Sequence, residues 1–167
     1  VDDEKSVLTF CERVLSRQGY EVKTALSGEE ALALLHEERF DLLATDILMP
    51  GLSGLELIQK ALTIQPDLAV IVITGLGTLD ISIQALRVGA HDFVTKPFTA
   101  ADLSQAVGYG LMQARHAKER ARLRLLEPLL ELSQKALYHR DVAQLGDSII
   151  KVAVSYLDAA GALLWLA

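Results

Sequence analysis

The run Ala-Val-Ile-Val-Ile-Thr at residues 69–74 constrains the fold most, because four β-branched apolar residues follow one another without a charge. Such a run is typical of a central strand that is covered on both faces. On either side of it, helix-like and strand-like patterns alternate over residues 1–100. Alternating strands and helices fold as a parallel sheet joined by right-handed crossovers. The sequence therefore predicts an α/β chain with a doubly wound, five-stranded parallel sheet.

Apolar spacing and helix-capping residues predict the order of the elements. Helices are expected around 7–15, 31–36, 55–62 and 81–88, and from 99 onward. Strands are expected at 20–25, 40–46, 69–74 and 92–96. Ser27 and Glu30 form a capping box for the second helix. Val1 would be the last residue of the first strand, so we interpret that strand as mostly missing and the chain as trimmed at its start.

Polar side chains follow four of the predicted strands at the carboxyl edge, where sites form in such sheets. They are Asp2 and Asp3 after the first strand, Asp46 after the third, Thr74 at the end of the fourth and Lys96 after the fifth. Taken singly, each of these residues has an ordinary explanation as a loop, turn or strand-end residue. Because all of them fall at the same edge, we expect them to form one site.

This set of side chains favours phosphoryl chemistry. Neighbouring carboxylates repel one another unless a cation is bound, and Mg²⁺ prefers oxygen ligands. Once a cation neutralises the cluster, Asp46 can act as a nucleophile toward phosphorus. Lys96 and the Thr74 hydroxyl can then pair with the phosphoryl oxygens.

Four segments together resemble the receiver domain of bacterial two-component response regulators. They are VDDE at 1–4, TDILMPGLSG at 45–54, VIVITG at 70–75 and GAHDFVTKPF at 89–98. The resemblance covers about residues 1–113 and implies a flavodoxin-like receiver fold. It also implies a cytoplasmic signalling protein that accepts phosphate from a sensor histidine kinase or phosphotransfer protein. Such a protein is not an enzyme beyond self-catalysed phosphoryl transfer and slow autodephosphorylation.

The resemblance assigns roles to individual residues. It implies that Asp46 is phosphorylated and that Asp2, Asp3, Asp46 and the main-chain carbonyl of Leu48 hold Mg²⁺. It implies that Thr74 and Lys96 bind the phosphoryl group. It further implies a cis peptide between Lys96 and Pro97.

Phe93 stands at the aromatic switch position of the family. The resemblance implies that its ring turns inward when Thr74 moves toward the phosphate. This would change the surface made by the helix at 81–88, the strand at 92–96 and the helix from 99 onward. From the residues alone, Phe93 is an ordinary core aromatic.

Leu48 and Leu76 each lie two residues beyond a residue of the predicted site, Asp46 and Thr74 respectively. In the family, polar side chains at these positions can help to orient an attacking water. Both are apolar here, so our hypothesis is that autodephosphorylation is slow.

The C-terminal part is predicted to extend the helix that begins after residue 99. Residues 114–136 form a linker helix with some a/d leucine spacing, which favours a coiled coil and a homodimer. Residues 137–167 resemble the start of a GAF sensor domain. The alternative is a dimerisation element that extends the helical bundle.

Composition limits the classes of function. The net charge of −6 and the pI near 5.2 argue against direct nucleic-acid binding. Cys11 is the single cysteine, so an internal disulfide or a cysteine metal cluster is excluded. No apolar run approaches the roughly 18–20 residues of a membrane span.

The sequence leaves three alternative functions to compare. A Mg²⁺-dependent phosphatase with an aspartyl nucleophile needs a second aspartate at position 48, where this chain has leucine. A nucleotide-binding flavodoxin-like domain needs a glycine-rich loop after the first strand, where acidic residues stand instead. The third is an unphosphorylated helical dimerisation or scaffold module.

Overall fold

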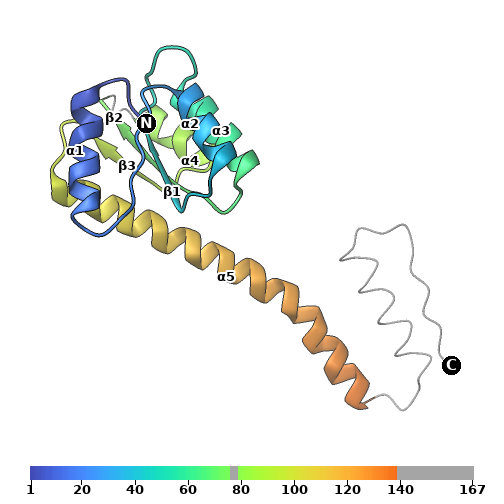
Figure 1. The fold of residues 1–167 in the computed structure, drawn as a ribbon. Coiled ribbons are helices and arrows are strands. Elements are labelled where there is room, and N and C mark those ends of the chain that lie inside the picture. The colour runs from blue at the N-terminus through green and yellow to red at the C-terminus, as the bar shows by residue number, and fades with distance from the viewer. Residues whose placement is uncertain (76–78, 139–167) are drawn as a thin grey trace. The chain divides into compact units, whose positions relative to one another are not determined.

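A parallel sheet of three strands lies between layers of helices in the unit Val1–Ala117 (Figure 1). The computed structural model describes residues 1–75 and 79–138. The strands are β1 (Leu42–Thr45), β2 (Ala69–Thr74) and β3 (Asp92–Thr95). The helices are α1 (Lys5–Ser16), α2 (Gly28–Glu37), α3 (Gly54–Ile64), α4 (Leu79–Arg87) and α5 (Ala100–Tyr138). A second unit, Lys118–Ala167, is described only as far as the last helical residue of α5.

Strand β2 is the central strand, as its composition predicts. It pairs in parallel with β1 through Ala44 and Ile71, and in parallel with β3 through Ile71 and Asp92. Every residue of β2 is buried. The parallel, doubly wound arrangement is therefore confirmed.

The two faces of β2 enter two separate cores. Val70 and Val72 pack in the cluster that α2, α3 and α4 cover, while Ile71 and Ile73 pack in the cluster that α1 and α5 cover. Successive side chains of a strand point to opposite faces. One β-branched run thus supplies apolar surface to both helical layers, which is why it carries no polar residue before Thr74.

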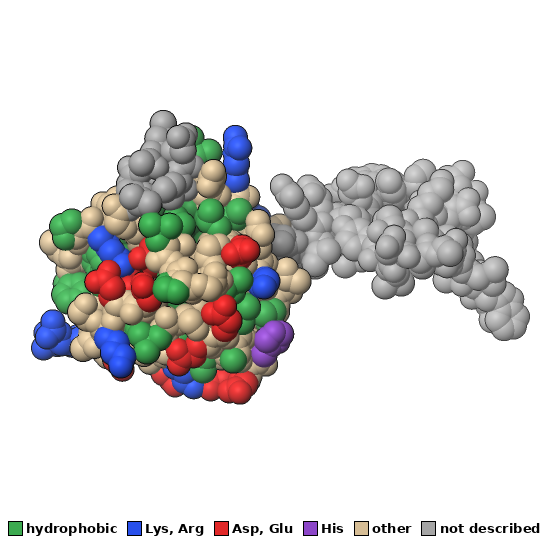
Figure 2. Space-filling model, turned by 90° about the horizontal axis from the view of Figure 1, so that it is seen from above, with side chains coloured by type: hydrophobic (Ala, Val, Ile, Leu, Met, Phe, Trp, Pro, Cys, Tyr) green, Lys and Arg blue, Asp and Glu red, His purple; other side chains and the backbone are tan. Residues whose placement is uncertain are grey.

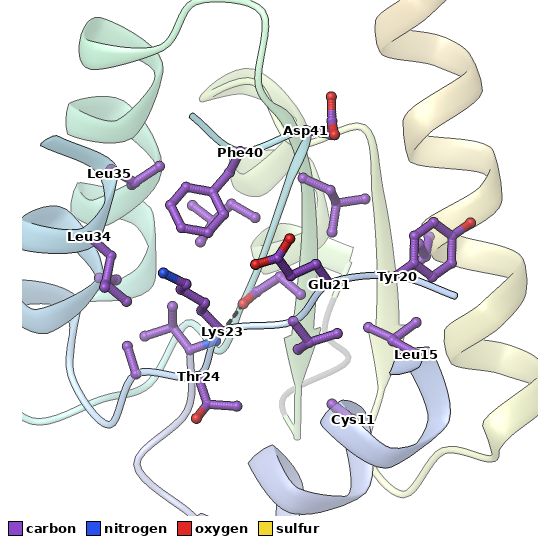
Figure 3. A pocket seen from close by; sticks show the side chains of 18 of the residues that line it. Cys11, Leu15, Tyr20, Glu21, Lys23, Thr24, Leu34, Leu35, Phe40 and Asp41 are labelled. Atoms are coloured by element: carbon purple, nitrogen blue, oxygen red, sulfur yellow. Dashed lines mark hydrogen bonds between the residues drawn. The ribbon is translucent and has the colours of Figure 1, made fainter. Parts of the chain in front are cut away.

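The strand predicted at 20–25 is wrong, and the described sheet has three strands rather than five. A groove of about 460 Å³ lies between this segment and β1 (Figure 3). Only one end of the groove is bridged: Val1 N donates to Ala44 O at 2.6 Å, and Asp2 N donates to Ala25 O at 3.2 Å. A strand needs a hydrogen-bonded neighbour along its length, and the backbone beyond this bridge has none on its groove side among the described residues.

The predicted capping residues of α2 are confirmed. Ser27 Oγ accepts the Glu30 N–H at 3.2 Å, and Glu30 Oε2 accepts the Leu26 N–H at 2.7 Å. A second capping box, between Ser53 and Glu56, begins α3. These contacts fix where α2 and α3 start relative to the loops before them.

Helix α5 runs without interruption from Ala100 to Tyr138 and includes Gly108, Gly110 and Pro128. Most of the leucines whose spacing predicts a coiled coil have side chains that the structure does not describe. The segment predicted to resemble a GAF domain lies outside the described residues after Tyr138. None of the described helices combines the length and apolar character needed to cross a membrane.

Candidate functional site

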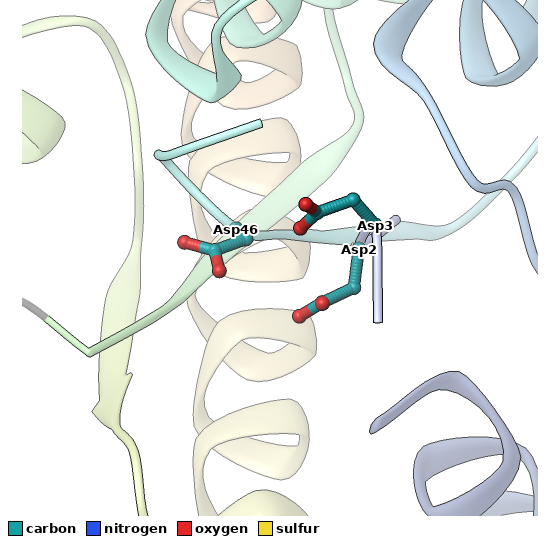
Figure 4. A group of neighbouring side chains, drawn as sticks. All are labelled: Asp2, Asp3 and Asp46. Carbon is teal, nitrogen blue, oxygen red and sulfur yellow. The ribbon is translucent and has the colours of Figure 1, made fainter. Parts of the chain in front are cut away.

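Three carboxylates meet at the carboxyl edge of the sheet, where the sequence predicts them. Asp46 directly follows β1, and Asp2 and Asp3 follow Val1, whose carbonyl accepts the Asp46 N–H at 3.0 Å. One oxygen from each carboxylate lies within 4.8 Å of the others (Figure 4). Asp2 and Asp46 are buried, with 2% and 6% of their surface exposed, whereas Asp3 is exposed. Two of the acidic groups are therefore shielded from solvent and the third forms the open side of the cluster.

Lys96 supplies the positive charge at this cluster. Its Nζ lies 2.7 Å from Asp46 Oδ2 and 2.7 Å from Asp2 Oδ2, with Glu4 Oε1 at 3.5 Å. Burial opposes the charge on Lys96, but the hydrogen bonds and the charges of Asp2 and Asp46 outweigh it and raise the pKa of the ammonium. The strand β3 delivers Lys96 here, and Lys96 N donates to Thr74 O at 2.8 Å. The cis peptide predicted between Lys96 and Pro97 is confirmed.

The backbone after Asp46 turns back toward its carboxylate. Leu48 N donates to Asp46 Oδ1 at 3.1 Å, and the Leu48 side chain is 58% exposed. Gly54 closes the loop by donating its N–H to Ile47 O at 3.0 Å. A Cβ atom at Gly54 would lie only 1.9 Å from the carbonyl oxygen of Asp46. No other residue type fits at position 54 while the aspartate keeps its place.

Thr74 and Phe93 lie on neighbouring strands near the cluster. Thr74 is the last residue of β2, is 2% exposed and pairs with Thr95 in the sheet register. Phe93 lies two pairs earlier on β3, opposite Val72, and its side chain is 42% exposed. The ring therefore does not belong to the core in this structure, contrary to the interpretation of Phe93 as an ordinary core aromatic.

The acidic cluster fits a hard divalent cation such as Mg²⁺. It offers three carboxylates at close range, the ligand type that Mg²⁺ prefers. Among the described residues, the buried atom Asp2 Oδ2 has no aligned hydrogen-bond donor, although Lys96 stands beside it as an ion pair. A metal ion that binds this oxygen would compete with the Lys96 ammonium for it.

Two residues that shape the site were not among the predicted ones. Glu4 lies at the outer side of Lys96, and Gly54 makes room for the Asp46 carbonyl. The acidic run VDDE contains Glu4, but its contact with Lys96 depends on where β3 ends. Nothing in the sequence around Gly54 indicates that it faces the carbonyl oxygen of Asp46.

Comparisons with known proteins agree with this geometry. Residues 1–108 match the response regulator receiver domain family. The C4-dicarboxylate transport transcriptional regulatory protein DctD of Rhizobium meliloti (strain 1021) is 37% identical over 123 residues, which cover 74% of this chain and 25% of DctD. The DNA-binding transcriptional regulator NtrC of Salmonella typhimurium is 32% identical over 160 residues, which cover 94% of this chain and 34% of NtrC.

A solved structure supports the same assignment. The CheY-like response regulator receiver domain protein from Methanospirillum hungatei JF-1 superposes with a TM-score of 0.65 at 32% identity. The match covers 70% of this chain and 93% of that one. By contrast, this chain spans only 25% to 44% of the length of the first curated relatives that it matches.

Proposed function

Because the chain belongs to the response regulator receiver domain family, we propose that it acts in two-component signalling by accepting a phosphoryl group on Asp46. One observation carries the choice of residue: Asp46 is buried beside two further carboxylates and lies 2.7 Å from the Lys96 ammonium. A carboxylate with a paired cation beside it is arranged to become an acyl phosphate, because the cation offsets the negative charge of the incoming phosphoryl group.

The proposed donor is the phosphohistidine of a sensor histidine kinase or of a phosphotransfer protein in the cytoplasm. A carboxylate oxygen of Asp46 attacks phosphorus, and the bond between phosphorus and the histidine nitrogen breaks. The electron pair of that bond stays on the imidazole of the donor. The acyl phosphate that forms on Asp46 carries the signal until water removes it.

Residues of this chain stabilise the charge that moves onto the phosphoryl oxygens. Lys96 pairs with one oxygen, and the Thr74 hydroxyl donates to another. Asp2, Asp3, Asp46 and the main-chain carbonyl of Leu48 would hold Mg²⁺. That ion supplies neutralisation of the charge on the reacting oxygens. Asp2 keeps the metal-binding side of the pocket in place through its bond to Ala25 O.

The proposed output is a change on the surface formed by α4, β3 and α5. Phe93 is exposed on β3 in this structure, and Thr74 lies two residues beyond Val72, the partner of Phe93 in the sheet register. Movement of Thr74 toward a phosphoryl group would open space that the ring can fill. Helix α5 then carries the change along its length to a homodimer contact or to a downstream module.

We propose no direct contact between this chain and nucleic acid. Residues 1–100 carry 8 Lys and Arg against 15 Asp and Glu, a net charge of −7. Figure 2 shows acidic side chains spread between apolar and basic ones on one face. NtrC is named as a DNA-binding regulator, but it is about three times as long as the segment that this chain matches.

A phosphatase with an aspartyl nucleophile is the competing function. Such an enzyme needs an acid two residues after the nucleophile, and Leu48 stands there with its side chain largely in solvent. The site can accept a phosphoryl group but has no acid at that position to protonate a leaving alcohol. We therefore propose that the chain is a switch that transfers a phosphoryl group to itself and releases it slowly.

Phosphorylation with acetyl phosphate and Mg²⁺, followed by intact mass measurement, tests the proposal. The wild-type chain should gain one phosphoryl group, and Asp46→Asn should gain none. Chromatography coupled to light scattering, with and without beryllofluoride, should show a shift toward dimer. Phosphate on the Asp46→Asn variant, or none on the wild type, would refute the assignment.

A further inference from the structure

The loop at residues 47–53 carries the backbone that follows Asp46, and it is anchored at both ends. Gly54 closes its base on Ile47, and the capping box of Ser53 and Glu56 fixes its exit into α3. Between these anchors lies the outer turn of the loop, which includes Gly51 and Leu52. Contacts there decide how firmly the backbone after Asp46 is held.

Glu29, from the first turn of α2, holds this outer turn. Its Oε1 accepts the Leu52 N–H at 3.1 Å. Gly51, with φ at +78°, lets the backbone turn directly beneath the carboxylate, since a Cβ there would lie 3.0 Å from the same oxygen. Gly28 allows close approach on the other side, because its own Cβ would lie 2.9 Å from Leu52 Cβ. Helix α2 and the loop therefore meet at one carboxylate and two glycines.

The neighbouring glutamate has a different task. Glu30 caps its own helix through the Leu26 N–H and through Ser27. Glu29 is not needed for that cap, and its carboxylate crosses to a segment 23 residues away in the sequence. Two adjacent acidic residues thus separate helix capping from loop holding.

We propose that Glu29 is a positioning residue for the loop at residues 47–53. By accepting the Leu52 N–H, Glu29 holds the backbone after Asp46 in the geometry that binds Mg²⁺. This inference rests on the proposed function, because it concerns the same acidic cluster. Leu48 lies between Asp46 and the turn that Glu29 holds. When Leu52 loses its acceptor, the loop gains freedom, and the metal must order the backbone of Leu48 when it binds.

Three variants separate this role from fold stability and from charge. Glu29→Ala removes the acceptor and a negative charge. Glu29→Gln removes the charge but keeps an oxygen that can accept the Leu52 N–H. Glu30→Ala removes the same charge from the adjacent position and weakens the helix cap without touching the loop.

Calorimetric titration with MgCl₂ and amide hydrogen exchange at Leu52 are the two measurements. Glu29→Ala should bind Mg²⁺ about three- to ten-fold more weakly and exchange Leu52 faster, since one hydrogen bond to a charged acceptor is lost. Glu29→Gln should stay close to wild type in both. Glu30→Ala should melt at a lower temperature and still bind Mg²⁺ as the wild type does.

Wild-type affinity in Glu29→Ala would overturn the inference, as would equal weakening in Glu29→Gln or Glu30→Ala. Neither measurement depends on phosphate transfer. If acetyl phosphate leaves wild-type Asp46 unmodified, the proposed function fails, while Mg²⁺ affinity and Leu52 exchange still decide the role of Glu29.

Discussion

Lys96 Nζ and Asp46 Oδ2 lie 2.7 Å apart, and the same ammonium lies 2.7 Å from Asp2 Oδ2. The positively charged Lys96 ammonium thus lies between two buried carboxylates. It neutralises the cluster and at the same time competes with any cation that uses the same oxygens. The two effects can be separated by removing the lysine.

Lys96→Ala should slow phosphorylation of Asp46 by about 100-fold, because a cation aimed at the transferred phosphoryl group is lost. The same variant should bind Mg²⁺ more tightly than the wild type, since the competing ammonium is gone. Phosphorylation kinetics by intact mass and calorimetric titration with MgCl₂ check the two parts. Lys60→Ala, which removes a lysine from the exposed side of α3, is the control for net charge. Weaker Mg²⁺ binding in Lys96→Ala would show that the lysine does not compete for these oxygens.

Gly54→Ala should destabilise the protein by about 3 kcal/mol or more, since overlap of this size forces the backbone to move. The added Cβ would overlap the Asp46 carbonyl at 1.9 Å, so Asp46 phosphorylation should fall as well. Gly108→Ala is the matched control, because it lies within α5 and a Cβ there meets no atom within 4 Å. That change should stabilise the protein by about 0.5–1 kcal/mol. Urea unfolding curves measure both variants, and equal effects would contradict the steric explanation.

The meeting of the site residues at one edge was predictable because it depends on topology more than on exact coordinates. Once β2 is identified as a central strand, parallel pairing places the ends of β1, β2 and β3 at one edge. Asp46, Thr74 and Lys96 then come together whatever the details of the loops. The caps of α2 were predictable for a similar reason, because Ser27 and Glu30 act within four residues of each other.

Other features depend on contacts that no local pattern records. Glu29 reaches a loop 23 residues away, and the only sign in the sequence is a second glutamate beside the capping one. The segment at 20–25 has the alternation of a strand, but a strand also needs a backbone partner along its length. The pattern indicates a preference of the side chains, and pairing decides whether the strand forms.

Slow loss of phosphate is the expected consequence of the apolar residues at positions 48 and 76. The exposed Leu48 side chain cannot hydrogen-bond a water beside Asp46. The double variant Leu48→Asn with Leu76→Glu should shorten the lifetime of the acyl phosphate by about ten-fold or more. Phosphate release after removal of acetyl phosphate measures the rate, with Leu48→Ala as the control that changes size but adds no polar group. An unchanged lifetime in the double variant would sink the hypothesis.

His91 should make the protein less stable as the pH falls below its usual pKa of 6.5. Burial lowers the pKa of His91 from its usual 6.5, and Nδ1 accepts the Val70 N–H at 3.1 Å, which requires the neutral ring. The unfolded chain therefore binds a proton more readily, so this contribution is present above pH 6.5 and is lost as the pH falls toward the lower, folded-state pKa.

His91→Asn is the variant that tests this, because its Oδ1 can accept the same N–H without titrating. Urea unfolding at a series of pH values should show a smaller loss of stability on acidification in His91→Asn than in the wild type. Parallel curves for the two proteins would show that other groups cause the dependence.

The groove beside β1 should accept an extended apolar segment placed directly before Val1. Its walls include apolar side chains such as Leu8, Leu15, Leu35 and Leu43, and Val1 already bonds to β1 at one end. Fusing Val-Ile-Val-Leu ahead of Val1 would bury apolar surface and give residues 20–25 a backbone partner. Burial of each apolar side chain stabilises the fold by about 1.5–3 kcal/mol, which exceeds the entropic cost of ordering four residues by a few kcal/mol in total. The melting temperature should therefore rise by roughly 5–15 °C.

A Ser-Gly-Ser-Gly extension of the same length is the control, and it should leave the melting temperature unchanged. Amide exchange at residues 20–25 should slow only with the apolar extension, because only that segment forms a ladder. Equal melting temperatures for the two extensions would show that the groove does not bind a strand.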